Sequence, residues 1–140
     1  MSLQAVLLPL FAEVILTFAL MLRMGALRNA DYRSGAVKPQ DIALRESKWP
    51  ARTAQTAFSF SNQFELPVLF YVLTILEWMT RHAGVLFVLL AWVFVVFRVL
   101  QAYVHVTSNI VRLRGAFYIV GALVLMVMWA IYIVQVMTGT

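Results

Sequence analysis

The chain has 140 residues, of which 63% are hydrophobic and 12% charged, whereas soluble domains have about 45–50% apolar and about 25% charged residues. A mean hydropathy of +0.86 leaves too little polar sequence to cover a water-soluble fold, so much of the apolar surface must face lipid. The absence of cysteine excludes protein disulfides, protein thiolate nucleophiles and cysteine-bound metals. The meaning of the net charge of +5 depends on where the basic residues lie along the chain.

Four apolar segments predict four membrane-spanning helices. They lie at about 3–22, 56–79, 84–106 and 116–137, and each is close to the roughly 20 residues with which a helix crosses about 30 Å of hydrocarbon. The apolar runs are continuous, without the alternation that is typical of an outer-membrane barrel. The first segment has no basic start and no small-residue cleavage site, so we expect it to be retained. The sequence therefore predicts one all-α domain over residues 1–140, with four transmembrane helices in a bundle.

The first connection, at about 24–54, is the one long polar stretch, and Gly35, Pro39 and Pro50 interrupt it. Within it we expect a short interfacial helix from Asp41 to Lys48. This helix would end at Trp49-Pro50, with Trp49 at the depth of the lipid headgroups.

The basic residues report the orientation of the chain. Two lie in the third connection, Arg112 and Arg114, one lies in the second, Arg81, and neither terminus has any. By the positive-inside rule, the first and third connections lie in the cytoplasm and both termini lie outside it. The charge thus indicates topology and contact with anionic membrane lipids, and it does not favour a nucleic-acid partner. Seven of the eleven basic residues belong to the first connection: Arg23, Arg28, Arg33, Lys38, Arg45, Lys48 and Arg52.

Three ionisable residues lie inside the predicted spans, namely Glu13, Glu65 and Arg98. A charge at the centre of a bilayer costs about 2.5–3.5 kcal/mol, so each of them needs a partner or water. All three lie at similar depths, because each is about the same number of residues from the cytoplasmic end of its helix. We expect Arg98 to be held by Glu65, with Glu13 as a competitor or third member. A charge-compensating cluster with a purely structural role is an alternative.

Polar residues form a stripe along the third span and its continuation. At spacings of 3, 4, 4 and 3, they fall on one face of a helix. A matching line on the second span ends at Glu65, and together the two predict a polar channel that opens to the cytoplasm. His82 and His105 are isolated from other ligand residues, so no metal site is expected. The stripe consists of Arg98, Gln101, His105, Asn109 and Arg112, and the matching line of Gln55, Ser59, Asn62 and Gln63.

The run Asn62-Gln63-Phe64-Glu65-Leu66-Pro67, followed by Arg98 and the pair Arg112/Arg114, resembles the MAPEG family, the membrane-associated proteins of eicosanoid and glutathione metabolism. The matching blocks, at about 49–71 and 98–118, are similar to the bacterial branch of this family. The resemblance implies a homotrimer that binds glutathione between neighbouring subunits. It also implies a reaction in which the glutathione thiolate adds to a lipophilic electrophile.

The resemblance also implies roles for individual residues. Asn62 and Glu65 match glutathione-contacting residues of the second helix, and Arg98 matches the arginine of the third. Arg112 matches the arginine that is held to stabilise the thiolate, with Arg114 as the alternative because the spacing is ambiguous.

Some positions depart from the pattern of the family. Gln101 and His105 replace two tyrosines of the third helix, although both can still hydrogen-bond a polar ligand. Phe58 and Phe60 replace an arginine and a glutamine of the leukotriene-forming members. We therefore assign glutathione binding to Asn62, Glu65, Arg98, Gln101 and His105.

These observations lead to one principal expectation about function. We expect a homotrimeric protein of a bacterial inner membrane, which uses glutathione as cosubstrate and no metal. It would be a transferase or peroxidase that acts on a lipophilic small molecule. One alternative is a noncatalytic membrane protein whose polar stripe is structural or binds a lipid headgroup. Another is a small transporter or proton pathway through Glu13, Glu65 and His105.

The predicted orientation can be tested with single cysteines, because the chain has none of its own. A cysteine at Ser34 should be shielded from an impermeant thiol reagent added to intact cells, and a cysteine at Thr138 should be labelled. Labelling at Ser34 but not at Thr138 would contradict the orientation.

Overall fold

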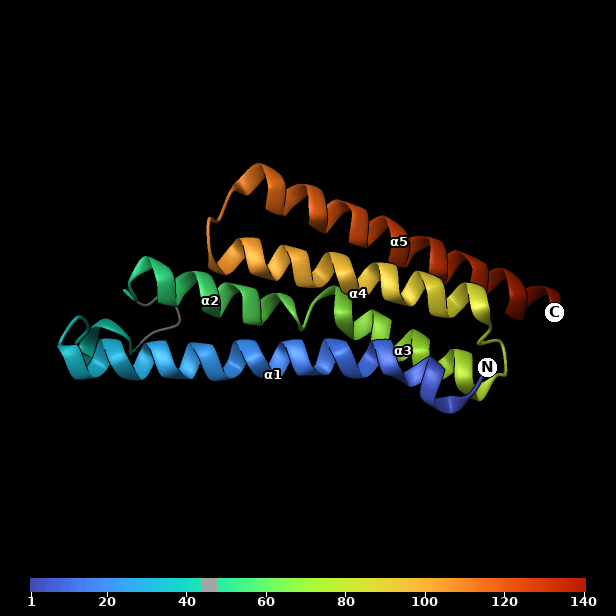
Figure 1. Ribbon diagram of the computed structural model, residues 1–140, viewed down its shortest axis with the longest axis horizontal. Coiled ribbons are helices and arrows are strands. Elements are labelled where there is room, and N and C mark those ends of the chain that lie inside the picture. The colour runs from blue at the N-terminus through green and yellow to red at the C-terminus, as the bar shows by residue number, and fades with distance from the viewer. Residues whose placement is uncertain (44–47) are drawn as a thin grey trace.

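The computed structural model describes residues 1–43 and 48–140. The helices run lengthwise beside one another, and both termini lie at the same end of the elongated molecule (Figure 1). Among the described helices, α1, α4 and α5 are long and apolar enough to cross a membrane. The predicted all-α class and the predicted membrane-spanning helices are confirmed for these three helices. The elements are α1 (Leu3–Ser34), a short 3-10 helix (Pro39–Asp41), α2 (Ala51–Asn62), α3 (Leu66–Met79), α4 (Val85–Val106) and α5 (Val111–Thr138).

The second predicted span, at about 56–79, is not one continuous helix, which corrects the prediction. Residues 63–65 separate it into α2 and α3. The break follows from Pro67, which has no N–H to donate and whose ring would collide with the carbonyl group of Gln63 in a continuous helix. The two helices follow one another along the bundle (Figure 1), so together they connect its two ends.

The first connection is shorter than the predicted 24–54, because α1 continues to Ser34. A helix of 32 residues is about 48 Å long, which exceeds the roughly 30 Å of hydrocarbon. Two hydrogen bonds hold the extension of α1 on α2: Thr53 donates to Asp31, and Arg23 donates to Thr56 at 3.3 Å. The helix ends at Gly35, which has a positive φ of 78° that glycine adopts without steric cost.

The predicted interfacial helix from Asp41 to Lys48 includes residues 44–47, which lie outside the described residues. Just before them, Pro39–Asp41 forms a 3-10 helix. Trp49 is half-buried, and its ring centre lies 5.2 Å from Cζ of Arg28 on α1. This cation–π contact connects the start of α2 with the extended part of α1.

The end of the bundle that holds the termini has an apolar interior. Side chains of α1, α3, α4 and α5 pack there in one cluster. The rings of Phe70 on α3 and Phe94 on α4 stack with centroids 4.9 Å apart. The cluster includes Val6, Phe70, Leu73, Ala91, Phe94, Leu125 and Met128.

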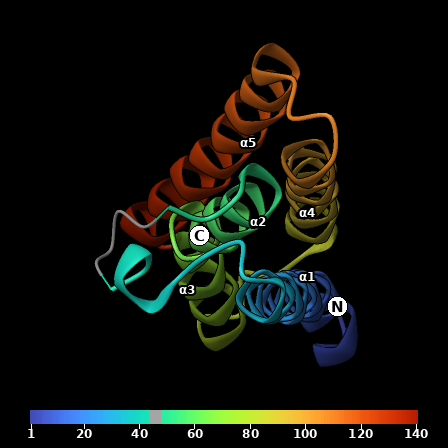
Figure 2. The same ribbon diagram turned by 90° about the vertical axis from the view of Figure 1, so that its left-hand side faces the viewer.

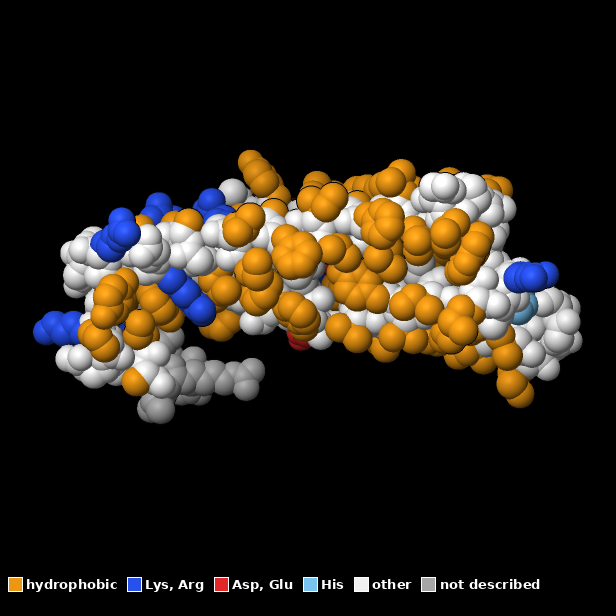
Figure 3. All heavy atoms as spheres, turned by 90° about the horizontal axis from the view of Figure 1, so that it is seen from below, with side chains coloured by type: hydrophobic (Ala, Val, Ile, Leu, Met, Phe, Trp, Pro, Cys, Tyr) orange, Lys and Arg blue, Asp and Glu red, His pale blue; other side chains and the backbone are white. Residues whose placement is uncertain are grey.

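The other end of the bundle has a polar interior. The buried residues of α2 and the last turns of α4 are largely hydrogen-bonding groups, among them Thr53, Thr56, Ser59, Gln101 and His105. The face of the molecule in Figure 3 carries hydrophobic side chains along its length, and Lys and Arg side chains gather toward the polar end. A membrane protein with a polar site inside it needs an apolar exterior toward the lipid and polar groups in its interior.

The docking of α1 on α2 can be tested with Thr53→Val, which removes a hydroxyl group and keeps the shape of the side chain. The buried Asp31 carboxylate then loses its donor, so the free energy of unfolding should fall by about 1–3 kcal/mol. Unfolding in mild detergent, followed by circular dichroism, measures this loss.

Thr138→Val is the matched control, because Thr138 is exposed and its hydroxyl group bonds only to neighbouring residues at the end of α5. It should change the free energy of unfolding by less than about 0.5 kcal/mol. Equal effects of the two variants would contradict a stabilising contact between Thr53 and Asp31.

Candidate functional site

A pocket of about 560 Å³ lies between α2, α4 and α5 at the polar end. α5 packs along α4, but its first half diverges from α2 (Figures 1 and 2). The pocket occupies this region, and its volume is within the roughly 300–1,000 Å³ of small-molecule sites. It is lined by Phe58, Asn62, Gln101, His105, Arg114, Gly115, Tyr118 and Ile119. The structure thus brings together Asn62, Gln101, His105 and Arg114, four of the residues that the sequence singled out.

Gln101 and His105 form the α4 side of the pocket. They are four residues apart, so they lie one above the other on the same face of the helix. Both are 4% exposed. The Nδ1 atom of His105 is buried and has no hydrogen-bond partner within the described part of the chain. Because an unpaired buried polar atom is costly, this nitrogen would be stabilised by a hydrogen bond that the described residues do not supply.

Arg98 lies one turn deeper on α4 and is 1% exposed. It donates from Nη1 to the Gln101 side-chain oxygen at 2.7 Å and from Nη2 to the main-chain oxygen of Asn62 at 2.9 Å. Asn62 is the last residue of α2, so its carbonyl group lies outside the regular helical pattern and accepts from the Glu65 N–H at 3.3 Å as well as from Arg98. The helix break before Pro67 therefore provides the acceptor that connects α2 with Arg98.

The ion pair that we expected between Arg98 and Glu65 is absent from the described residues. Glu65 lies in the break between α2 and α3, where its side chain is exposed and does not line the pocket. Residues 63–65 leave the helix, so Glu65 is not carried on the α2 face that meets α4. The fully buried carboxylate is Glu13 on α1, whose charge interacts with that of Arg98 more strongly than the charge of Glu65 does. Neither oxygen of Glu13 has a hydrogen-bond partner among the described groups.

The polar stripe on α4 ends at His105, because the helix ends at Val106. Asn109 has a positive φ of 49°, and its N–H donates to the Val104 carbonyl at 2.7 Å. Asparagine tolerates this left-handed conformation better than most residues. The turn at Asn109 therefore removes it and Arg112 from the predicted helical stripe.

The two arginines at the start of α5 have different surroundings. Arg112 is exposed and does not line the pocket. Arg114 lines the pocket and donates from Nη1 to the side-chain oxygen of Asn109 at 2.7 Å. Asn109 thus holds the Arg114 guanidinium at the pocket. Of the two arginines considered for contact with a thiolate, it is therefore Arg114 that lines the pocket and not Arg112.

α5 also contributes Gly115 and Tyr118 to the lining of the pocket, two residues that were not predicted from the sequence. Tyr118 lies four residues after Arg114, so helical spacing alone puts both on one face. Its ring centre is 5.9 Å from Cζ of Arg98. Gly115 has no side chain to fill the space, and nothing lies within 4 Å of the position that a Cβ would take there.

The family of the chain follows from a comparison with family models. The model described as the MAPEG family matches residues 6–134. Comparisons with curated proteins and with solved structures give no significant match. The matched range includes all the residues that line the pocket, together with Glu13 and Arg98. The chain therefore belongs to the MAPEG family and is an integral membrane protein of that family.

Proposed function

We propose that the pocket between α2, α4 and α5 binds glutathione, and that the protein is a glutathione-dependent transferase or peroxidase acting on lipophilic electrophiles. The observation that carries this proposal is Arg114, a permanent cation, in one pocket with Asn62, Gln101 and His105. The basic end of the bundle then faces the cytoplasm of a bacterium, where glutathione is dissolved, and both termini lie outside.

The chemistry of the pocket suits glutathione as a ligand. Glutathione carries two carboxylates, one ammonium group and one thiol, so it needs donors more than acceptors. The His105 and Asn62 side chains can donate hydrogen bonds to its carboxylates, and the Arg114 guanidinium can donate to its sulfur once that is ionised. A volume of about 560 Å³ is sufficient for a tripeptide.

We assign the stabilisation of the thiolate to Arg114. A guanidinium stays protonated near neutral pH, and it favours a sulfur anion over a neutral thiol. The thiol proton then leaves to solvent, and the thiolate adds to the electrophilic carbon of an activated double bond to form the C–S bond. The electron pair of that double bond takes up a proton from solvent. Arg98 acts one turn below as a positioning residue, because it holds the Gln101 side chain and the end of α2.

A lipophilic substrate can reach this pocket from the membrane. Phe58 and Ile119 belong to the lining, and their side chains are 63% and 58% exposed. Exposed apolar residues on a membrane-spanning bundle face lipid or another subunit. The pocket therefore combines a polar interior for the thiol with an apolar rim for the electrophile.

The proposal includes assembly as a homotrimer. The exposed Glu65 lies among exposed apolar neighbours, namely Phe64, Val68 and Leu69. A carboxylate facing hydrocarbon is costly, so a second copy that covers Glu65 with polar groups would stabilise it. Contact at this surface would bring Glu65 into an intersubunit site.

The alternative is a noncatalytic protein that binds a lipid headgroup in the same pocket. The exposed rim residues Phe58 and Ile119 also fit this function, because acyl chains would lie against them. The two functions differ in one respect that can be measured, since only the first requires recognition of a thiol.

Replacement of each α5 arginine separates their roles. Arg114→Ala should keep the affinity for S-methylglutathione within about threefold, because the blocked sulfur gains little from a guanidinium, but should abolish the thiolate absorbance of bound glutathione near neutral pH. Calorimetry with both ligands and ultraviolet difference spectra measure the two effects.

Arg112→Ala is the matched control and should keep both ligands and the thiolate absorbance. A thiolate signal lost in Arg112→Ala and kept in Arg114→Ala would contradict the assignment. If the wild-type protein binds neither ligand at millimolar concentration, the noncatalytic function takes the place of the proposed one.

Assembly can be measured by native mass spectrometry in mild detergents. The expected species is the trimer that the family resemblance implies, with Glu65 covered by a neighbouring copy. A monomer or a dimer that persists in several detergents would rule out an intersubunit site.

A further inference from the structure

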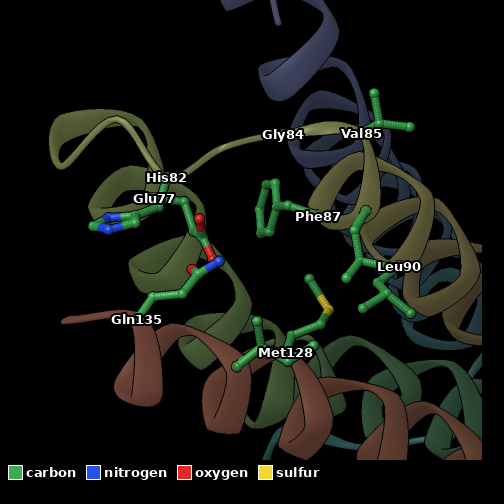
Figure 4. A pocket seen from close by; sticks show the side chains of 10 residues that line it. Glu77, His82, Gly84, Val85, Phe87, Leu90, Met128 and Gln135 are labelled. Carbon is green, nitrogen blue, oxygen red and sulfur yellow. The ribbon is translucent and has the colours of Figure 1, made fainter. Parts of the chain in front are cut away.

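A second cavity, of about 190 Å³, lies at the end of the bundle that holds the termini. It is bordered by the last turns of α3 and α5 and by the beginning of α4 (Figure 4). None of its lining residues belongs to the proposed glutathione pocket. Its walls are mainly apolar, with Phe87 and Leu90 from α4 and Met128 from α5. The polar groups in it are concentrated on one side, around Glu77 and Gln135.

Glu77 is 3% exposed, and its Oε2 atom has no hydrogen-bond partner in the described parts of the chain. The side-chain oxygen of Gln135 is likewise buried and unpaired there. Figure 4 shows both side chains extending into the same region, opposite Phe87, Leu90 and Met128. The cavity thus holds two buried oxygen atoms that accept no hydrogen bond within the described residues, beside an apolar wall. Such a site requires a ligand that donates hydrogen bonds.

The ends of the helices also favour a cation in this cavity. Glu77 lies in the last turn of α3, where the helix dipole destabilises an anion and stabilises a cation. Gln135 lies in the last turn of α5, so a second helix directs its negative end to the same place. α4 begins at the cavity with its positive end, but none of its N–H groups donates to the Glu77 carboxylate in the described structure. A positively charged ligand would therefore stabilise a buried carboxylate in this position.

We propose that this cavity binds a small primary amine with an aromatic or alkyl body. The ammonium group donates to Glu77 and Gln135, and the body lies against Phe87, Leu90 and Met128. The size is suitable for one ring with a short arm, because an apolar cavity of about 150 Å³ accommodates benzene. His82 stands at the rim, where its ring nitrogens bond to the Thr80 hydroxyl group and the Thr140 carbonyl.

The test uses phenethylamine and its neutral analogue 2-phenylethanol, with the full-length protein in nanodiscs of zwitterionic lipid. Protein labelled with ¹³C-methyl methionine reports the site, because Met128 lines the cavity and Met21 lies exposed on the far part of α1. Phenethylamine should shift the Met128 signal saturably and leave the Met21 signal in place. The alcohol should bind at least about tenfold more weakly, because it lacks the charge.

Glu77→Gln removes the charge and keeps the shape of the side chain. It should weaken phenethylamine binding about tenfold or more, to the level of the alcohol. Asp41→Asn is the matched control, because it removes a carboxylate at the opposite end and should leave the affinity unchanged.

Three results would overturn the proposal. They are equal affinity of the wild-type protein for amine and alcohol, an unchanged amine affinity in Glu77→Gln, and non-saturable shifts of all methionines, Met21 included. If Glu77→Gln does not fold, the comparison of amine and alcohol on the wild-type protein decides the matter.

Discussion

The contact of Arg98 with the end of α2 is the constraint on which the polar half of this protein depends. Pro67 interrupts the second span, so the Asn62 carbonyl lies outside the regular helical pattern, and Arg98 donates to it at 2.9 Å. The same guanidinium holds Gln101 and interacts with the charge of the buried Glu13. A charge in this part of a membrane protein is tolerated because three helices, α1, α2 and α4, contribute to its surroundings. The pocket lies next to Arg98, one turn farther along α4.

The interior of the bundle differs between its two ends. The half around α3 is packed with apolar side chains, which keeps α3, α4 and α5 in contact. The half around α2 buries polar groups, and there α5 diverges from α2 and the large pocket forms (Figures 1 and 2). An apolar packed cluster at one end thus accompanies an open polar pocket at the other. The small cavity at Glu77 is an exception inside the apolar half, which is why its unpaired acceptors indicate a ligand.

The sequence predicted the features that depend on local spacing and composition. Continuous apolar runs predicted the helices, and a four-residue spacing correctly placed Gln101 and His105 on one face. It could not predict where each helix ends. Hydropathy marks where α1 leaves the lipid, but the helix continues to Ser34 because α2 supports it. Two further differences arise where the backbone changes direction, which helical periodicity does not reveal. The break at residues 63–65 leaves Glu65 exposed. The turn at Asn109 brings Arg114 to the pocket in place of the expected Arg112.

The most direct measurement is the free energy of unfolding of Arg98→Met alone and combined with Glu13→Gln or Glu65→Gln. Arg98→Met leaves a buried carboxylate without its counter-charge, so we predict a loss of about 3–5 kcal/mol. Glu13→Gln in the same chain should restore part of this loss, and Glu65→Gln should restore less of it, because Glu65 is exposed and its charge interacts more weakly with that of Arg98. Additive losses with Glu13→Gln, or a recovery with Glu65→Gln instead, would contradict the role given to Arg98.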